Sequence, residues 1–165
     1  MVLVTFRAAK GDDCSVLATM RYEFRVELDR ATEPKTKFVR RCAAWMRKQL
    51  GQGLWRCWLA ELDGRVVGHV WVDLIEKIPN PVGEPEVHAY VSNCYVVPEM
   101  RNRSIGERLL KQALVWCKAK GTDAIILWPT ARSRSFYTKC GFEGSTRMLV
   151  RQKKTRGSRH RKAGN

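Results

Sequence analysis

The chain has 165 residues, of which 44% are hydrophobic, and a formal net charge of +15 at pH 7. This length and composition favour one domain with a sizeable core, and the lack of any run of about 18 apolar residues excludes a membrane-spanning class. The N-terminus has no basic region followed by a long apolar segment, and the six cysteines are scattered without a C-x-x-C pair. We therefore expect reduced thiols in a cytoplasmic protein.

Apolar periodicity and turn residues predict an ordered series of strands and helices. In chain order these are a strand at Val2 to Phe6, a helix capped by Asp12 or Asp13, a helix from Pro34 to about Gly51, strands at Leu54 to Leu62 and Val66 to Ile75, a strand at Val87 to Val97, a helix from Ser104 to Gly121, a strand at Ala124 to Trp128, a helix at Thr130 to Cys140 and a strand at Phe142 to Gln152. This order predicts an α/β (α+β) fold with a mostly antiparallel sheet.

The turn before the helix at Ser104 has the features of an anion site. The N–H groups of a first helical turn have no intrahelical partners, and the helix dipole is positive at that end. Arg101 and Arg103 add charge at the mouth of the turn, and Gly106 has no side chain that would keep a phosphate away from the backbone. Ser104 and Glu107 predict a capping box. The alternative is an ordinary strand-to-helix turn with solvated arginines.

The stretch Val97-Pro98-Glu99-Met100-Arg101-Asn102-Arg103-Ser104-Ile105-Gly106 resembles the acetyl-CoA-binding signature of the GNAT superfamily of N-acetyltransferases. Ser104 stands where the family usually has glycine. The feature that this serine puts in doubt is the close approach of the backbone to a pyrophosphate. The predicted order of elements also matches the GNAT fold up to about Arg151. The resemblance implies six to seven strands flanked by about four helices, with the domain at residues 1–151 and a basic tail at residues 152–165.

A second stretch resembles the other GNAT motif. It reads Ser135-Phe136-Tyr137-Thr138-Lys139-Cys140-Gly141-Phe142 and places the family's general acid at Tyr137. A thiolate leaving group needs a donor that keeps its proton at neutral pH, and tyrosine, with a pKa of about 10, qualifies. Thr130 and Ser133 stand where the family often has Asn and Ala. The alternative for Tyr137 is a packed core aromatic.

The resemblance also implies how a cofactor would be held. The backbone of the strand at Cys94, Tyr95, Val96 and Val97 would pair with the pantetheine arm, and the Val96 N–H would polarise the thioester carbonyl. The remaining cofactor contacts that it implies are at Arg101, Asn102, Arg103, Ser104, Ile105, Gly106, Trp128 and Ser133. No Cys/His cluster has metal-ligand spacing, so we expect no metal.

The proton acceptor is less firmly indicated. Strand alternation puts His88, Tyr90, Ser92 and Cys94 on one face, and histidine titrates near neutral pH, so His88 is the first candidate base. A surface or core histidine is the alternative, and Glu86 is the second candidate, acting like His88 through a water. His69, between Gly68 and Val70, is interpreted as structural. The expected acceptor contacts are Asp73, Glu76, Glu84, Tyr90 and Ser92.

Charge is unevenly distributed. Residues 100–165 contain seventeen basic and three acidic residues, whereas residues 61–99 contain two basic and seven acidic ones. This split suits a polyanionic cofactor and a cationic amine, although charge scattered for solubility is the alternative. Together with this charge split, the resemblance predicts an acetyl-CoA-dependent N-acetyltransferase acting on a small cationic amine.

Two other functions stay open at this point. One is a protein or peptide acetyltransferase, acting for example on a ribosomal protein. The other is a nucleic-acid-binding module that uses the basic half of the chain. The tail from Arg147 to Asn165 has eight basic residues and no acidic ones. A solvated tail is favoured over one that contacts nucleic acid, and the sequence leaves a homodimer open.

Overall fold

The computed structural model of the protein describes residues 3–144. The chain packs as two compact units, Met1–Trp128 and Pro129–Asn165. The first contains β1 (Thr5–Ala8), η1 (Gly11–Asp13), α1 (Cys14–Glu27), α2 (Lys35–Gln52), β2 (Trp55–Leu62), β3 (Arg65–Glu76), β4 (Val87–Val96), η2 (Pro98–Met100), α3 (Ile105–Ala119) and β5 (Ala124–Ile126). The second contains η3 (Ala131–Ser133) and α4 (Arg134–Lys139).

The five strands form one sheet in the order β1-β2-β3-β4-β5. The first three pairings are antiparallel and β4 pairs with β5 in parallel, so the predicted α/β fold with a mostly antiparallel sheet is confirmed. The predicted number of six to seven strands is wrong for the described residues, which form five. The remaining predicted strand, Phe142 to Gln152, lies outside the described residues except for residues 142–144, which are not a strand.

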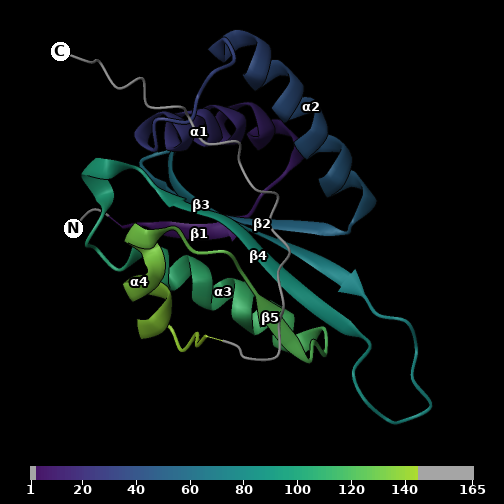
Figure 1. Ribbon diagram of the computed structural model, residues 1–165. Coiled ribbons are helices and arrows are strands. Elements are labelled where there is room, and N and C mark those ends of the chain that lie inside the picture. Colours follow the sequence, from purple (N-terminus) through teal and green to yellow (C-terminus); the bar gives the residue numbers. More distant parts are fainter. Residues whose placement is uncertain (1–2, 145–165) are drawn as a thin grey trace, which may run out of the picture. The chain divides into compact units, whose positions relative to one another are not determined.

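The helices of the first unit cover both faces of its sheet. In Figure 1, α1 and α2 lie on one face and α3 lies on the other. Apolar residues spaced three and four apart form the buried stripe of α3, and they are Ile105, Leu109, Leu110, Ala113 and Cys117. Gly121, the predicted end of this helix, follows α3 with a φ of +68°, a left-handed conformation that glycine adopts readily.

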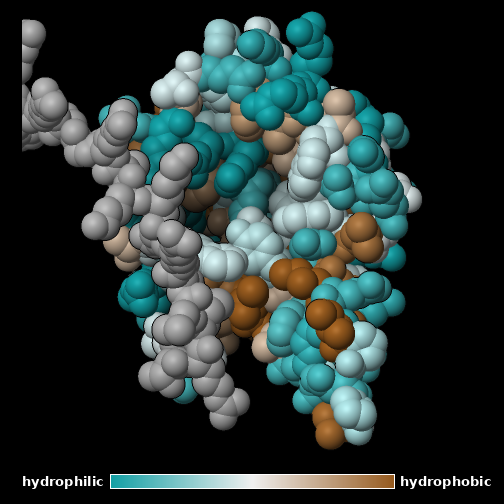
Figure 2. All heavy atoms as spheres, turned by 45° about the vertical axis from the view of Figure 1, so that its right-hand side comes forward, coloured by the Kyte–Doolittle hydropathy of each residue, from teal (hydrophilic) through white to brown (hydrophobic). Residues whose placement is uncertain are grey.

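β3 is joined to its neighbouring strands by a tight turn on one side and a long loop on the other. Asp63 and Gly64 join β2 to β3 with φ values of +49° and +76°, as the Asp-Gly hairpin signal predicts. The loop from β3 to β4 projects beyond the sheet (Figure 1), and the space-filling view shows hydrophobic residues on it (Figure 2). Ile78 and Val82 in this loop are exposed.

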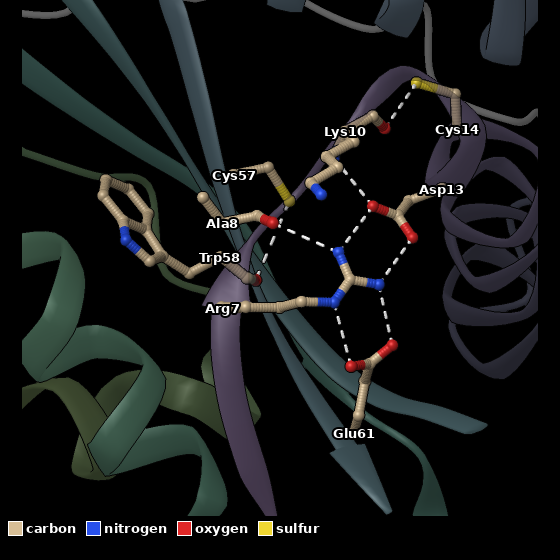
Figure 3. A network of polar contacts seen from close by, with 8 residues as sticks. All are labelled: Arg7, Ala8, Lys10, Asp13, Cys14, Cys57, Trp58 and Glu61. Atoms are coloured by element: carbon tan, nitrogen blue, oxygen red, sulfur yellow. Dashed lines mark hydrogen bonds and ion pairs between the residues drawn. The ribbon is translucent and has the colours of Figure 1, made fainter. Parts of the chain in front are cut away.

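An ionic network joins β1, β2 and the start of α1 (Figure 3). The Arg7 guanidinium donates to both carboxylate oxygens of Asp13, at 2.8 Å each, and to both of Glu61, at 2.9 and 2.7 Å. Asp13 also accepts from the Lys10 N–H at 2.7 Å. Hydrogen bonding to Arg7 lowers the pKa of both carboxylates. Arg7 therefore fixes the N-terminal strand to the first helix.

Candidate active site

A bulge interrupts β4 where the site was predicted. His69 faces Tyr95 and Trp71 faces Ser92, so Asn93 and Cys94 both stand opposite Val70. Asn93 has a φ of +51°. A bulge of this kind shifts the alternation of side chains by one residue. The prediction that Cys94 shares the face of His88, Tyr90 and Ser92 is therefore wrong, and Tyr95 takes that place.

The bulge is anchored to α1. Arg21 donates to the Asn93 side-chain oxygen at 3.0 Å, and burial lowers the pKa of Arg21. His69 on β3 is fully buried near the bulge, and burial, with the charge of Arg21 as a smaller cause, lowers its pKa to about 3. His69 is thus neutral at physiological pH, which fits the structural role predicted for it.

Beyond Tyr90, β4 has an open edge. β5 pairs only with His88, Ala89 and Tyr90, while β4 continues to Val96 without a strand partner on that side among residues 3–144. The Val97 N–H donates to the Val67 carbonyl of β3 at 3.0 Å. Because backbone groups alternate along a strand, the Val96 N–H points to the open edge. This is the N–H that was predicted to polarise a carbonyl.

The open edge leads into the predicted anion site. The first bond of α3 runs from the Arg108 N–H to the Ser104 carbonyl, so the N–H groups of Ile105 and Gly106 have no acceptor within the helix. Asn102 and Ser104 have φ values of +60° and +56°. Together they turn the chain sharply between the short helical turn η2 and the first turn of α3.

The predicted capping box at the start of α3 is absent. Ser104 makes no side-chain bond to the helix. A capping side chain reaches the helix from an extended backbone, and Ser104 is left-handed instead. A left-handed residue at this place is what glycine, the usual residue of the family signature, adopts without strain.

The two arginines of the turn are held differently. Arg101 donates from Nη2 to both Glu27 oxygens, at 2.9 and 2.7 Å, and from Nε to the Val96 carbonyl at 2.9 Å. The Tyr95 hydroxyl donates to Glu27 at 2.7 Å. Arg103 is exposed and has no ion pair within the described residues. The charge available to an anion is therefore that of Arg103.

His88 belongs to a charged cluster at the other end of β4. Its Nδ1 lies 2.5 Å from Asp123, which also accepts from Lys77 at 2.7 Å. Hydrogen bonding to Lys77, more than to His88, lowers the pKa of Asp123. Glu84 accepts from Lys77 at 3.4 Å and from Asn80 at 2.6 Å. His88 and Glu84 thus both contact neighbouring charged or polar side chains.

His88, the first predicted base, stands five residues before Asn93, about 16 Å along the strand. Glu86 and Glu76 are exposed and lie further still from the bulge. The remaining predicted acceptor residues come together: Asp73 stands opposite Tyr90, and Ser92 is two residues further along the same face. Burial raises the pKa of Asp73.

The second unit contains Tyr137, in α4. Its side chain is buried, with 9% exposed, and packs against Phe136 and Phe142 at ring distances of 5.0 and 5.7 Å. Ser133 exchanges hydrogen bonds with Thr130 at the start of η3. The predicted roles of Tyr137 and Ser133 stay predictions.

Two further observations bear on the class of protein. Within residues 3–144, no group of three or more His, Cys, Asp or Glu side chains could hold a metal ion. No helix in the described part of the chain is both long enough and apolar enough to span a bilayer.

Two known proteins are similar to this chain in sequence. An uncharacterized N-acetyltransferase of Methanocaldococcus jannaschii is 28% identical over 147 residues, which are 84% of this chain and 60% of that protein. The chain thus spans less than two thirds of that relative's length. An uncharacterized N-acetyltransferase of Archaeoglobus fulgidus is 26% identical over 139 residues, 79% of this chain and 87% of the other.

Solved structures share the fold. A predicted acetyltransferase of Clostridium acetobutylicum, crystallised with acetyl-CoA, has a TM-score of 0.76 at 22% identity, with 91% of this chain and 96% of that one covered. The aminoglycoside N-acetyltransferase AAC(6')-Iy in complex with CoA has a TM-score of 0.72 at 14% identity, with 94% and 97% covered. The model of the acetyltransferase (GNAT) family matches residues 21–142. The chain therefore belongs to the acetyltransferase (GNAT) family.

Proposed function

We propose that the protein is an acyltransferase that moves an acetyl group from acetyl-CoA to a primary amine of a small cationic molecule. One observation carries the proposal: the open edge of β4 leads directly to the N–H groups that begin α3. An edge of unpaired strand suits an extended amide chain, and a helix N-terminus suits a pyrophosphate. Two structural neighbours crystallised with acetyl-CoA or CoA support the same cofactor.

In this proposal the chain holds the cofactor mainly through its backbone. The Val96 N–H would donate to the thioester carbonyl oxygen, where negative charge would develop as the amine attacks. Residues 94–97 line the arm, while the N–H groups of Ile105 and Gly106 and the Arg103 guanidinium hold the pyrophosphate. Further predicted contacts are Asn102, Ser104, Trp128 and Ser133. When bound, acetyl-CoA supplies the activated acetyl group.

Two proton transfers complete the reaction. Tyr137 donates a proton to the departing thiolate. The amine gives up its proton through water. Asp73 stands three residues from Val70, the residue that faces the bulge, or about 10 Å along the strand. Because His88 and Glu86 are further away, we propose that the water leads to Asp73 first.

The experiment is a coupled binding and turnover assay on the purified full chain. We expect acetyl-CoA to raise the melting temperature, and small alkylamines to release free thiol faster than acetyl-CoA hydrolysis alone does. Arg103→Ala weakens the thermal shift, whereas Lys111→Ala, which removes a charge from the exposed side of α3, leaves it in place. No shift at millimolar acetyl-CoA would overturn the proposal.

The acceptor is tested in the same assay. Small alkylamines are compared with a neutral arylamine and with a lysine-containing peptide at equal concentration. Higher kcat/KM for the peptide would overturn the small-molecule half of the proposal and support the alternative of a protein acceptor. We also propose that the protein acts in the cytoplasm, as the sequence predicts.

A further inference from the structure

A row of aromatic rings crosses the sheet face that α1 and α2 cover. Trp45 of α2 lies 5.4 Å from Trp55 of β2, measured between ring centroids. Trp55 lies 6.3 Å from Tyr90 of β4, and Tyr90 lies 5.2 Å from Trp128. Each pair meets edge to face. These four rings, which we call the aromatic row, extend from α2 to the segment after β5.

Asp73 lies beneath the middle of the aromatic row. It stands directly opposite Trp55 on one side and Tyr90 on the other. The backbones of β2 and β4 are about 10 Å apart because β3 lies between them. The rings of Trp55 and Tyr90 are closer than that, so they lean toward one another over Asp73. Burial raises the pKa of its carboxyl group accordingly.

Asp73 is also without a positive partner. It accepts from the backbone at Leu74, but it forms no ion pair within residues 3–144. Of the other carboxylates of the β3–β4 region, those of Glu84 and Asp123 are engaged with Lys77, whereas those of Glu76 and Glu86 are exposed to solvent. A half-buried carboxylate under aromatic rings is costly unless a cation can reach it.

The aromatic row stands where β4 and β5 part. Tyr90 is the last residue of β4 that pairs with β5, and Trp128 lies two residues after the end of β5. Trp45 is 44% exposed and Trp128 is 54% exposed, so a solute can reach the ring faces. The open edge of β4 begins at the next residue. A molecule bound at the aromatic row would thus stand beside the proposed cofactor path.

Among residues 3–144, a positive charge on α1 faces the same region. Arg21 of α1 is close enough to interact electrostatically with Tyr90, and Asn93 holds its guanidinium. Its charge would repel a cation from the α1 side of Tyr90. A bound cation is therefore confined to the side of Asp73, Trp55 and Trp128.

We propose that the aromatic row and Asp73 form a cage for the ammonium group of an alkylamine acceptor. Aromatic faces attract organic cations, and the carboxylate supplies the counter-charge. The cage would favour protonated alkylamines over neutral arylamines. Acetylation of the acceptor rests on the proposed function: Gly68, the partner of Val96, is five residues from Asp73, about 16 Å along β3, so the attacking amine is a neutral one elsewhere on the bound molecule. The cage itself can be tested without that reaction.

The probe is choline, and its control is the neutral isostere 3,3-dimethylbutan-1-ol. Both are titrated into the full chain without acetyl-CoA, with tryptophan fluorescence and calorimetry as readouts. We expect saturable choline binding and an affinity for the isostere that is lower by about fivefold or more. Asp73→Asn and Trp128→Leu each weaken choline binding by about tenfold. Melting temperatures of the variants show that they fold.

The matched control is Trp116→Leu. Trp116 packs against Trp58, on the opposite face of the sheet, so this variant loses a tryptophan and keeps the cage. Equal binding of choline and its isostere would reduce the cage to an apolar patch and overturn the inference. So would the absence of saturable choline binding. If the acetyl-CoA thermal shift persists in either case, only the cage fails; if choline binds and the shift is absent, the acetyltransferase proposal fails instead.

Discussion

Arg101 is occupied before any ligand arrives. Its guanidinium contacts both oxygens of Glu27 and the carbonyl of Val96, so its charge is balanced within the protein. These contacts join the turn before α3 to the end of α1 and to the last residue of β4. Arg103, by contrast, is exposed, two residues later in the same turn. The geometry therefore separates a positioning arginine from one that can meet a phosphate.

We predict different losses for the two arginines. Arg103→Ala weakens acetyl-CoA binding by about tenfold, as expected for one charge-assisted hydrogen bond, and leaves the melting temperature unchanged. Arg101→Ala lowers the melting temperature, because Glu27 and the Val96 carbonyl lose the guanidinium that they share. Calorimetry and thermal unfolding measure the two effects. The opposite result, in which Arg101→Ala weakens acetyl-CoA binding and Arg103→Ala lowers the melting temperature, would show that Arg101 leaves Glu27 to bind the phosphate.

Tyr137 is predicted to act only through its hydroxyl proton. Tyr137→Phe keeps the packing against Phe136 and Phe142 but lowers kcat by about a hundredfold. The Kd for acetyl-CoA, measured by calorimetry, stays the same. Tyr22→Phe, which removes a hydroxyl from a ring that packs against Phe38, serves as the control. Unchanged turnover in Tyr137→Phe would make Tyr137 a packing residue.

At the scale of elements, local signals predicted most of the fold. The Asp63-Gly64 turn, the apolar stripe of α3 and the stop at Gly121 depend on neighbouring residues, so the sequence contains them directly. The bulge in β4 has no such local signal in the sequence. Asn93 tolerates a positive φ, but no glycine or break in the apolar pattern marks it. A single extra residue moved Tyr95 into the place predicted for Cys94.

The proposed acceptor region was predicted only in part. Asp73, Tyr90 and Ser92 follow from strand alternation and do come together. Trp45 and Trp55 come from α2 and β2, and only the packing of a helix on the sheet brings them to Tyr90. His88 met the chemical criterion for a base, whereas its distance from the bulge and its contact with Asp123 depend on the register of β4.

The bulge can be tested through its left-handed residue. Asn93→Gly loses the bond from Arg21 but keeps the backbone conformation without strain. Asn93→Ala loses the same bond and holds a Cβ at a positive φ, which costs about 1–2 kcal/mol more. We therefore expect the alanine variant to have the lower free energy of unfolding in urea. Equal values for the two variants would mean that the bulge does not need a left-handed residue.

The ionic network of Arg7 predicts a dependence of stability on pH. The folded-state pKa values of Asp13 and Glu61 are lowered mainly by hydrogen bonds from Arg7. Both carboxylates therefore add to the free energy of unfolding above about pH 4, where they are also ionised in the unfolded chain. This stabilisation is lost as the pH falls through their lowered folded-state pKa values. Arg7→Met should destabilise the protein by about 1 kcal/mol at pH 7 and by less at pH 3. Urea unfolding at the two pH values measures this, and an equal loss at both would contradict it.

The charge of the whole chain concentrates on its second half. Residues 100–165 hold seventeen basic and three acidic residues, and residues 152–165 hold six of those basic ones. The family model ends at residue 142, and the predicted tail lies outside the described residues. The groups proposed to bind the anion, the Ile105 and Gly106 N–H groups and the Arg103 guanidinium, all precede residue 142. We therefore propose Arg151 as the end of the domain.

A chain that ends at Arg151 tests this boundary and the role of the charge together. We expect it to keep the melting temperature of the full chain and, at about 0.15 M salt, an acetyl-CoA Kd within about twofold. At that ionic strength the Debye length is about 8 Å, so charges outside the site contribute little. At low salt the full chain should bind acetyl-CoA more tightly than the shortened one, because the added positive charge attracts the polyanion over a longer range. Loss of the acetyl-CoA thermal shift in the shortened chain would instead place part of the cofactor site beyond Arg151.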